Sequence, residues 1–390
     1  MSSPLRLVHI TTVAESLRFL RGQPAFLAER GFSVHAITSP GPLVESMSGE
    51  LGIPIHTVPM PRAITPAADL VALGQLVGHL LRIRPHIVHA HTPKAGLLGM
   101  LAATLTGVPV RVYHMRGLPM QTAEGWKRAL LSTTERTSCA LAHQVIAVGE
   151  SLRSFAVAEG LCAPERIAVL ANGSGQGVDA MGRFNPDGVS PRIVDDLRHQ
   201  WSIAADRPVV GFVGRLVADK GIIELLEAWR SLRAHPSNPQ LLLVGPLEER
   251  DGLPADVRDE LSEDPSIVTV GNQQEIEKFY ALMDLVVLPT HREGFPNVPL
   301  EAAAMGLAVA ASNIAPCQEA VAEGETGVLF ECGSAEGITS RVTAYLDDPA
   351  LRARHGAAGR RRVVEHFSPE LIQHELAACY DRLVTTSAAL

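Results

Sequence analysis

The sequence predicts an α/β protein made of two doubly wound domains. The length, the order of apolar runs and one interruption near the middle carry this prediction. At 390 residues the chain is too long for one ordinary domain and suits two, each able to bury its own core. Short runs of Val, Leu and Ile alternate with stretches of helical periodicity, which predicts mainly parallel sheets with helices on both faces.

In the first half, the expected strands are separated by helical stretches or loops. Residues 16–30 carry apolar side chains at helical spacing despite Pro24, so we expect a helix there. The first domain should extend over residues 1–188. Its expected strands are LRLVHI, FSVHAIT, IPIHTV, HIVHAH, VPVRVYHM, HQVIAV and RIAVLAN.

Gly, Pro and Asp interrupt the alternation over residues 180–207, and we expect the domains to join near residue 190. The alternation restarts with PVVGFVGRL, and a second domain should extend over residues 189–368. Its further strands are LLLVG, SIVTVG, DLVVLPT, LAVAAS and GVLF. The final segment, residues 369–390, contains a helical pattern.

Composition narrows the classes of function. No run of ~20 apolar residues is present to span a membrane, and the N-terminus enters a strand without the charged leader and apolar core of a signal peptide. Five scattered cysteines form neither a disulfide framework nor a zinc spacing. We therefore expect a cytoplasmic protein, because such cysteine usage is typical of a reducing compartment.

The net charge of −8 is unevenly distributed. Residues 1–185 hold 16 Lys and Arg against 11 Asp and Glu, a net charge of +5, and the remainder holds 18 against 31, a net charge of −13. The acidic second half argues against nucleic acid as a partner. The mildly basic first half favours an anionic surface or acceptor, although an ordinary solvated surface accounts for the same counts.

The first loop of the second domain has the composition of an anion site. In GFVGRLVADKG a strand ends at Gly214, Arg215 and Lys220 follow, and Gly221 precedes an amphipathic helix. The N–H groups at a helix entrance favour phosphate oxygens, to which Arg adds a planar fork and Lys a mobile charge. A surface turn with two cations is the alternative. The loop matches neither the phosphate-binding P-loop nor the dinucleotide fingerprint.

A second motif, THREGFPNVPLE, follows the apolar run DLVVLPT. Pro296 and Pro299 forbid a regular helix through Glu293, so we expect a strand, a tight loop and a helix from Val298 or Pro299. Such a loop would lie at the carboxyl ends of the strands, where open α/β sheets bind ligands. Taken alone, Glu301 would be interpreted only as a residue that favours a helix N-terminus.

The two motifs together, GRLxxxKG and EGFPNVPLE, resemble the donor site of nucleotide-sugar glycosyltransferases with the GT-B fold, and most of all glycosyltransferase family 4. The resemblance covers essentially the whole chain, and HAHTPKAGLLG, MRGLP and NGSGQGVD are similar to the branch of capsule and lipopolysaccharide enzymes. It implies two doubly wound, Rossmann-like domains facing across a cleft, with the acceptor on the first and the donor on the second. It also implies that the helix within residues 369–390 crosses back to the first domain.

The resemblance implies a role for each matching residue. Arg215 and Lys220 would bind the donor diphosphate and neutralise the charge that develops on it as it departs. Glu301 would accept hydrogen bonds from the ribose hydroxyls, and Glu293 would contact hydroxyls of the sugar. The remaining donor contacts, several of them through backbone atoms, are expected at Gly214, Gly245, Val270, Gly294, Phe295, Pro296, Asn297 and Val298.

His114 and Arg116 are the candidates for the reacting face of the first domain. Many relatives carry His-Gly after this strand, and alignment on Gly117 places Arg116 at the histidine position and His114 two residues earlier. Arg116 could hold an anionic sugar, an acceptor phosphate or the donor diphosphate, or it could form an ordinary ion pair.

His89 and His91 lie on one face of their strand. A metal site would need a third ligand, and none is evident in the sequence. We therefore expect no metal, and a structural or acceptor-facing His91 with Lys94 nearby.

The resemblance implies a retaining enzyme that needs neither a metal nor another cofactor, with a nucleoside diphosphate sugar, most readily a UDP-sugar, as co-substrate. The expected acceptor is a hydroxyl of a lipid-linked saccharide at the cytoplasmic face of the inner membrane. Leu97, Leu98 and Leu118 could contact that membrane or lie in the core. The alternatives are a small-molecule or natural-product acceptor, and further away a nucleotide-sugar epimerase or a non-catalytic binding module.

Overall fold

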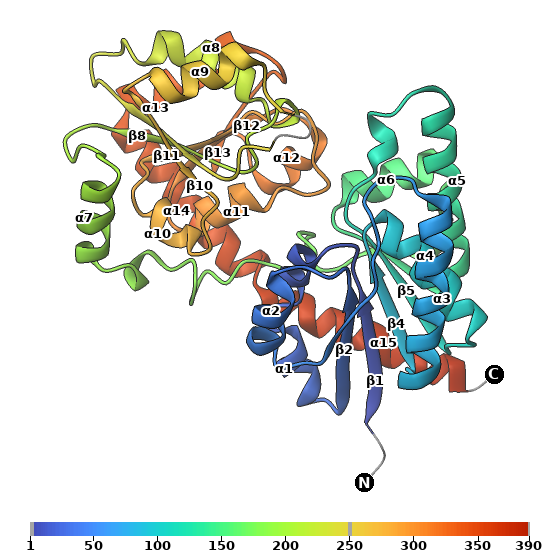
Figure 1. The fold of residues 1–390 in the computed structure, drawn as a ribbon. Helices are drawn as coiled ribbons and strands as arrows, with labels where there is room; N and C mark the ends of the chain where they lie inside the picture. The colour runs from blue at the N-terminus through green and yellow to red at the C-terminus, as the bar shows by residue number, and fades with distance from the viewer. Residues whose placement is uncertain (1–3, 249–251, 389–390) are drawn as a thin grey trace. The chain divides into compact units, whose positions relative to one another are not determined.

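The computed structural model describes residues 4–248 and 252–388, which form two compact units (Figure 1). Unit 1 ends at Gln176 and resumes at Pro369, and unit 2 comprises Gly177–Ser368. The division thus lies before residues 177–188, which the sequence analysis assigned to the first domain. The last helix, α15 (Pro369–Ala388), belongs to unit 1 although it follows unit 2 in the chain.

Unit 1 is built on a seven-stranded sheet in the order β3-β2-β1-β4-β5-β6-β7. Every neighbouring pair is parallel, as the continuous apolar runs predict. The strands are β1 (Leu5–Ile10), β2 (Phe32–Thr38), β3 (Ile55–Thr57), β4 (Ile87–His91), β5 (Val110–Met115), β6 (Gln144–Ala147) and β7 (Ile167–Val169).

Helices cover both faces of this sheet. On one face α4 (Pro93–Leu105) packs between α3 (Pro66–Ile83) and α5 (Gly125–Leu141). On the other face α1 (Gln23–Ala28) and α15 pack over β1, β2 and β5, with Leu7, Leu27 and Leu376 in one buried cluster. Figure 1 shows α15 running across the sheet on the side away from α3 and α4. Unit 1 also contains α2 (Leu43–Leu51) and α6 (Glu150–Ala158).

The helix expected over residues 16–30 is divided in two. A 3-10 helix, η1 (Ala14–Leu20), precedes the short α-helix α1, and Gly22 between them has a φ of 72°. Pro24 lies in the first turn of α1, where its missing N–H costs nothing. The apolar spacing was interpreted correctly as helical, but a proline favours the start of a helix over its interior.

Unit 2 has a six-stranded parallel sheet in the order β10-β9-β8-β11-β12-β13. Its strands are β8 (Val209–Val213), β9 (Gln240–Val244), β10 (Ile267–Gly271), β11 (Leu285–Leu288), β12 (Ala308–Ser312) and β13 (Gly327–Phe330). The two-layered covering of this sheet and its strand order make it a second doubly wound domain.

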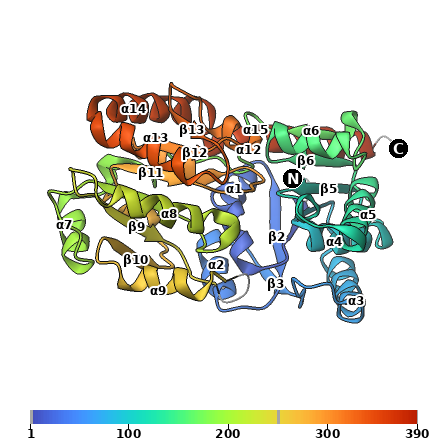
Figure 2. The same ribbon diagram turned by 90° about the horizontal axis from the view of Figure 1, so that it is seen from above.

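Two sets of helices enclose the second sheet. α8 (Ile222–Leu232), α9 (Ala255–Glu263) and α13 (Ala335–Asp347) share a buried core with one face, and α13 lies beside α8 in Figure 2. α11 (Asn297–Ala304) and α14 (Pro349–His366) pack together on the other face, where α10 (Ile276–Tyr280) and α12 (Ala315–Ala320) also lie. The interruption near residue 190 contains a further helix, α7 (Pro191–Gln200), whose cap Ser190 accepts from the N–H of Ile193.

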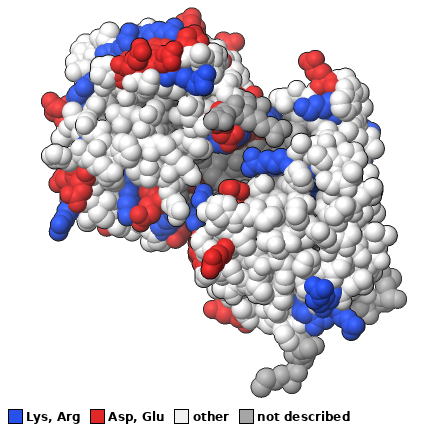
Figure 3. All heavy atoms as spheres, viewed as in Figure 1, with Lys and Arg blue, Asp and Glu red and all other residues white. Residues whose placement is uncertain are grey.

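Charged side chains of both signs are interspersed over α8 and α9 (Figure 3). Arg230 pairs with Glu260 at 2.7 Å and Arg233 with Asp264 at 2.6 Å. Pairs of this kind at the surface are typical of a solvated face. Within residues 4–248 and 252–388, no helix combines the length and the apolar character needed to cross a membrane.

Candidate functional site

Each sheet has one position where the strand order reverses. In unit 2 it lies between β8 and β11, since the chain proceeds from β8 to β9 and β10 and then returns to the other side of β8. Loops that leave the two central strands diverge there, and ligands of open α/β sheets bind in the resulting crevice. The two sequence motifs follow these two strands.

The motifs meet through an ion pair. Lys220 Nζ lies 2.5 Å from Glu293 Oε1, and both side chains are largely buried. Lys220 ends the short 3-10 helix η5 (Ala218–Lys220) after β8, and Glu293 lies in the loop after β11. The structure therefore brings together two residues that the sequence analysis assigned to one donor.

Further contacts join the same two loops. The N–H of His291 donates to the Asp219 carbonyl at 3.0 Å, and Arg292 forms an ion pair with the Asp219 carboxylate at 3.2 Å. Gly221 has a φ of 72°, and a Cβ there would lie 2.0 Å from the Pro289 carbonyl oxygen. The loops can approach so closely only because this position is glycine.

Arg215 lies on the surface of the same edge. Its Nη1 is 2.9 Å from Glu248 Oε2, and its side chain is about half exposed. The adjacent Gly214 packs against Gly245 at the end of β9, where a Cβ would lie 1.8 Å from the Gly214 carbonyl oxygen. The glycines predicted at this edge thus hold the ends of β8 and β9 in contact.

The helix after the second motif begins slightly earlier than expected. α11 starts at Asn297, after Pro296, and not at Val298 or Pro299. Prolines are tolerated in a first turn because its N–H groups have no partner within the helix. Gly294 and Phe295 precede the helix, and the Phe295 ring is buried 6.1 Å from that of Phe367.

Glu301 lies on α11 and accepts a hydrogen bond from the Tyr280 hydroxyl at 3.0 Å. Burial, with the charge of Glu301, holds the pKa of Tyr280 well above its usual value, so the hydroxyl stays a donor. This tyrosine was not identified from the sequence, since nothing in its own stretch marks it as a partner of a residue 21 positions away.

The expected base contact at Val270 has a partner of its own. The side-chain amide of Gln273 donates to the Val270 carbonyl at 2.6 Å. The N–H of Gly245 is likewise bonded to the Gly271 carbonyl at 2.9 Å. The Val270 carbonyl has a second lone pair, so a base could bind it beside Gln273.

Unit 1 gathers four histidines at the corresponding edge of its own sheet. His9 of β1, His89 and His91 of β4 and His114 of β5 point to one face, with neighbouring ring centroids 4.2–5.3 Å apart. All four are buried. His9 was not identified from the sequence, and it joins the others because it pairs with His89 across the sheet.

Three of these rings, from His9, His89 and His91, offer nitrogens within 4.8 Å of one another, so the third residue of a potential metal site does exist. The hydrogen bonds do not suit a metal. Arg116 Nε donates to His91 Nδ1 at 3.3 Å, so the hydrogen of His91 is on Nε2 and neither ring nitrogen has a free lone pair for a metal. Metal-bound histidines instead donate through their second nitrogen.

The imidazoles form a neutral chain. Nε2 of His91 lies 2.9 Å from Nδ1 of His9, and Nδ1 of His89 lies 2.6 Å from the Tyr380 hydroxyl of α15. Burial, together with the charge of Arg116, lowers the pKa of His9 to about 3 and holds the pKa values of His89, His91 and His114 well below their usual value. The predicted candidates His114 and Arg116 therefore lie in one cluster.

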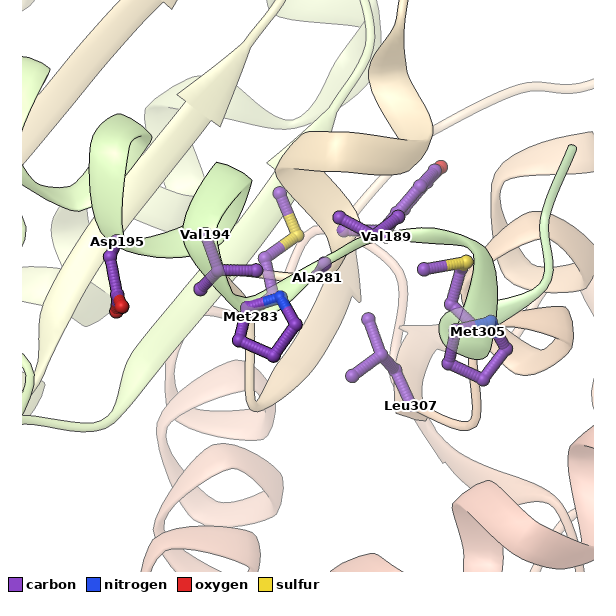
Figure 4. Close-up of a pocket in the computed structure, with 10 residues that line it drawn as sticks. Val189, Val194, Asp195, Ala281, Met283, Met305 and Leu307 are labelled. Carbon is purple, nitrogen blue, oxygen red and sulfur yellow. The ribbon is translucent and has the colours of Figure 1, made fainter.

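A pocket of about 360 Å³ lies elsewhere in unit 2 (Figure 4). It is lined by apolar side chains that include Val194, Met283, Met305 and Leu307. Met283 precedes β11 and Leu307 precedes β12, so the pocket is at the amino ends of these strands. The two motifs follow the carboxyl ends, and this pocket is not part of their site.

Comparison with known families matches both units. The family model for glycosyl transferases group 1 matches residues 194–362, and the glycosyl transferase 4-like domain matches residues 18–173. A capsular polysaccharide biosynthesis glycosyltransferase, CapM of Staphylococcus aureus, is 32% identical over 382 residues, which cover 98% of each chain.

Solved structures share the fold at low identity. HepE of Anabaena, solved in complex with UDP-glucose, superimposes with a TM-score of 0.80 at 20% identity over 97% of this chain and 100% of that one. Sucrose-phosphate synthase of Thermosynechococcus elongatus gives 0.79 at 21% identity, over 98% and 100%. These likenesses confirm the predicted GT-B fold. The chain belongs to the group 1 glycosyltransferases of the family 4 type and is a hexosyltransferase enzyme.

Proposed function

We propose that this enzyme transfers a hexose-type sugar from a UDP-sugar to a hydroxyl of a lipid-linked saccharide in cell-surface polysaccharide synthesis. The reaction retains the anomeric configuration and requires no divalent metal. The convergence of Lys220, Glu293 and Arg215 at the strand-order reversal of unit 2 carries the proposal, because these side chains provide paired charges at the edge where such a fold binds nucleotides.

Lys220 and Arg215 bind the donor diphosphate. Each is now paired with a carboxylate, Glu293 and Glu248 respectively, at a distance that a phosphate oxygen would also occupy. When the diphosphate binds, it takes over the ammonium of Lys220, and Glu293 turns to hydroxyls of the sugar. The two cations then stabilise the negative charge that develops on the departing UDP, which is the task that a metal performs in other enzymes.

The start of α11 binds the middle of the donor. N–H groups of a first helical turn attract phosphate and sugar oxygens, and the loop from Gly294 to Val298 supplies them. Glu301, one turn further, accepts from the ribose hydroxyls in place of the Tyr280 hydroxyl that it holds now. One helix thus binds both the sugar and the nucleoside of the donor.

Transfer takes place on one face of the sugar. The bond between the anomeric carbon and the phosphate oxygen breaks, and the acceptor oxygen forms its bond to that carbon from the same side. The departing phosphate accepts the proton of the acceptor hydroxyl, so the step needs no side-chain nucleophile. Exclusion of water from the closed site protects the donor from hydrolysis.

A lipid-linked acceptor is supported by the surface of unit 1. Leu98 and Leu118, two of the residues considered for membrane contact, lie in the core and do not serve it. At the start of α5, however, Trp126 is 75% exposed, and the exposed Lys127 follows it. An exposed tryptophan beside a cation is typical of a protein that rests on a membrane surface.

Two relatives support the choice of donor and pathway. HepE was solved with UDP-glucose, and CapM is named for capsular polysaccharide biosynthesis. The test is a calorimetric titration of the metal-free enzyme with UDP, GDP, ADP and their glucose conjugates. We expect saturable binding of UDP and UDP-glucose alone. Binding of another nucleotide family would reject UDP as the donor base, and an absolute need for added Mg²⁺ in transfer assays would reject the metal-independent reaction.

A further inference from the structure

We propose that Arg116, held by the chain of neutral histidines, is a receptor for an oxyanion carried by the sugar substrate, either a sugar carboxylate or a phosphate. The inference rests on the proposed function and specifies a class of substrate that glycosyl transfer alone does not require. It concerns a site formed within unit 1.

Every contact of the Arg116 side chain is with a neutral group. Nε donates to His91 Nδ1 at 3.3 Å, and Nη2 donates to the Gly175 carbonyl at 3.4 Å. The guanidinium carbon lies 4.0 Å from the centre of the Phe19 ring. These three groups fix the plane of the guanidinium without neutralising its charge.

No described Asp or Glu forms an ion pair with Arg116. Burial lowers the pKa of this guanidinium to about 9, so its surroundings disfavour the charge although the group remains protonated at neutral pH. A partly buried cation without an opposite charge is costly, and a ligand that supplies that charge would remove the cost. An anion is the missing partner.

The histidines explain why the cation is oriented so well. Because His91 Nδ1 accepts from Arg116, its Nε2 hydrogen is directed at Nδ1 of His9, 2.9 Å away. The low pKa values of His9 and His91 keep both rings uncharged at neutral pH. Neither imidazole therefore adds a second positive charge that could bind the anion in place of Arg116. His91 is thus a positioning residue for Arg116.

The geometry of the free donors selects the ligand. A guanidinium has five N–H donors, and two of those of Arg116 are used. The remaining three lie in the plane of the guanidinium, and such a planar group can bind the two oxygens of a carboxylate or phosphate. A sugar that carries only hydroxyls would leave the charge without compensation.

The test uses the full-length protein labelled with ¹⁵N at histidine. The imidazole resonances of His91 and His9 report on Arg116 directly, and the probes are glucuronate, inorganic phosphate and glucose. To prevent phosphate at the donor site from contributing, each titration is repeated with Lys220→Ala. We expect glucuronate or phosphate to shift the His91 resonances in both proteins and glucose to leave them unchanged.

Arg116→Gln should weaken that response at least tenfold, and Arg116→Lys, which keeps the charge but loses the fork, should be intermediate. Arg82→Gln, an exposed arginine on α3, is the matched control and should respond as the wild type does. A thermal unfolding curve verifies that each variant is folded. A response to glucuronate alone assigns a sugar carboxylate, and a response to phosphate alone assigns a phosphate.

Equal responses in Arg116→Gln and the wild type, or no response to either anion, would overturn the inference. Titration with UDP in the same samples separates this failure from that of the proposed function. If UDP binds and no anion affects His91, the receptor is wrong while the donor site stands. If anions shift the His91 resonances and UDP does not bind, the anion receptor stands and the proposed donor site is wrong.

Discussion

The two units present the same edge of the same kind of sheet with opposite electrostatic designs. At the edge of unit 2, Lys220 and Arg215 each have a carboxylate partner, Glu293 and Glu248. At the edge of unit 1, Arg116 contacts the neutral imidazole of His91, a carbonyl and an aromatic ring, and no carboxylate of the described chain pairs with it. The fold therefore fixes where a ligand lies but leaves its charge to a few side chains.

This difference determines how the cations of each edge are stabilised when no ligand is bound. In unit 2 carboxylates hold both cations, and under the proposed function a diphosphate would replace them, so binding would be an exchange of partners. In unit 1 nothing is exchanged, and an anion would meet a charge that is already oriented. The first design costs little stability in the empty state, whereas the second stores a desolvation penalty that binding relieves.

The largest expected effect tests the exchange in unit 2. Lys220→Ala removes the diphosphate contact and leaves Glu293 largely buried without a partner, so we expect kcat/KM for the donor to fall about a hundredfold, or about 3 kcal/mol. Lys278→Ala, which removes a lysine from a surface pair with Glu275, is the control and should change kcat/KM less than about twofold. Equal activity of the two variants would contradict the assignment of Lys220.

A second effect concerns Glu135, another buried ionisable group of unit 1, and it tests whether burial there shifts ionisation as it does for the histidines. Glu135 accepts from the Tyr113 hydroxyl at 2.7 Å, and burial raises the pKa of Glu135 from 4.5 to about 7. The folded state thus binds more protons than the unfolded state between these pH values, and stability should fall as pH rises from 4.5 to 7.

Glu135→Gln keeps a neutral acceptor for Tyr113 and removes this fall. The variant should be more stable than the wild type by about 2 kcal/mol at pH 8 and equally stable below pH 4.5. Urea unfolding followed by Trp126, the tryptophan of unit 1, measures it, because Trp201 and Trp229 belong to unit 2. If the free energies of unfolding of the wild type and the variant differed by the same amount at every pH in this range, the Glu135 carboxyl would ionise normally.

A smaller effect concerns the far end of the donor. Glu301→Ala should weaken UDP binding about tenfold, because one charge-assisted contact to ribose is lost. Tyr280→Phe removes one hydrogen-bond donor to Glu301 without touching the carboxylate, and it should bind UDP as tightly as the wild type or more so. Calorimetry measures the UDP affinity of both variants. A tenfold loss of affinity in Tyr280→Phe would mean that UDP binding depends on the Tyr280–Glu301 hydrogen bond and not on a contact between Glu301 and the ribose.

The smallest effect tests the histidine chain. Tyr380→Phe leaves Nδ1 of buried His89 without its partner, which should cost about 1 kcal/mol of unit 1 stability. Thermal unfolding monitored at Trp126 should shift, whereas the fluorescence of the unit 2 tryptophans should not. If the unit 2 transition moved equally, the two units would unfold together and the assignment to the chain of histidines would fail.

The fold was predictable because buried parallel strands are continuous apolar runs, and Val, Leu and Ile mark most of them. The donor-side motifs were predictable for a related reason, since two loops after neighbouring strands must meet. The position where the chain leaves unit 1 was not, because residues 177–188 contain the same turn-forming residues as the linker that was expected after them.

The features that sequence reasoning missed depend on partners distant in the chain. His91 has a neighbour at strand spacing, His89, but its hydrogen-bond partner His9 is joined to it only through the pairing of β1 with β4. Tyr380 reaches His89 from the last helix, which no spacing rule could indicate. Local patterns predict elements and loops, while these side-chain contacts require the register of the sheet.

α15 belongs to unit 1 although it follows unit 2 in the chain, and this affects the order in which the two units can fold during synthesis. The ribosome makes nearly all of unit 1 and then the whole of unit 2 before it makes α15, the helix that supplies Leu376 and Tyr380 to the core of unit 1. Unit 2 can complete its core while attached to the ribosome, whereas unit 1 must wait, with one face of its sheet covered only in part, until α15 has been made. A chain released before α15 is made would therefore have a complete unit 2 and an incomplete unit 1.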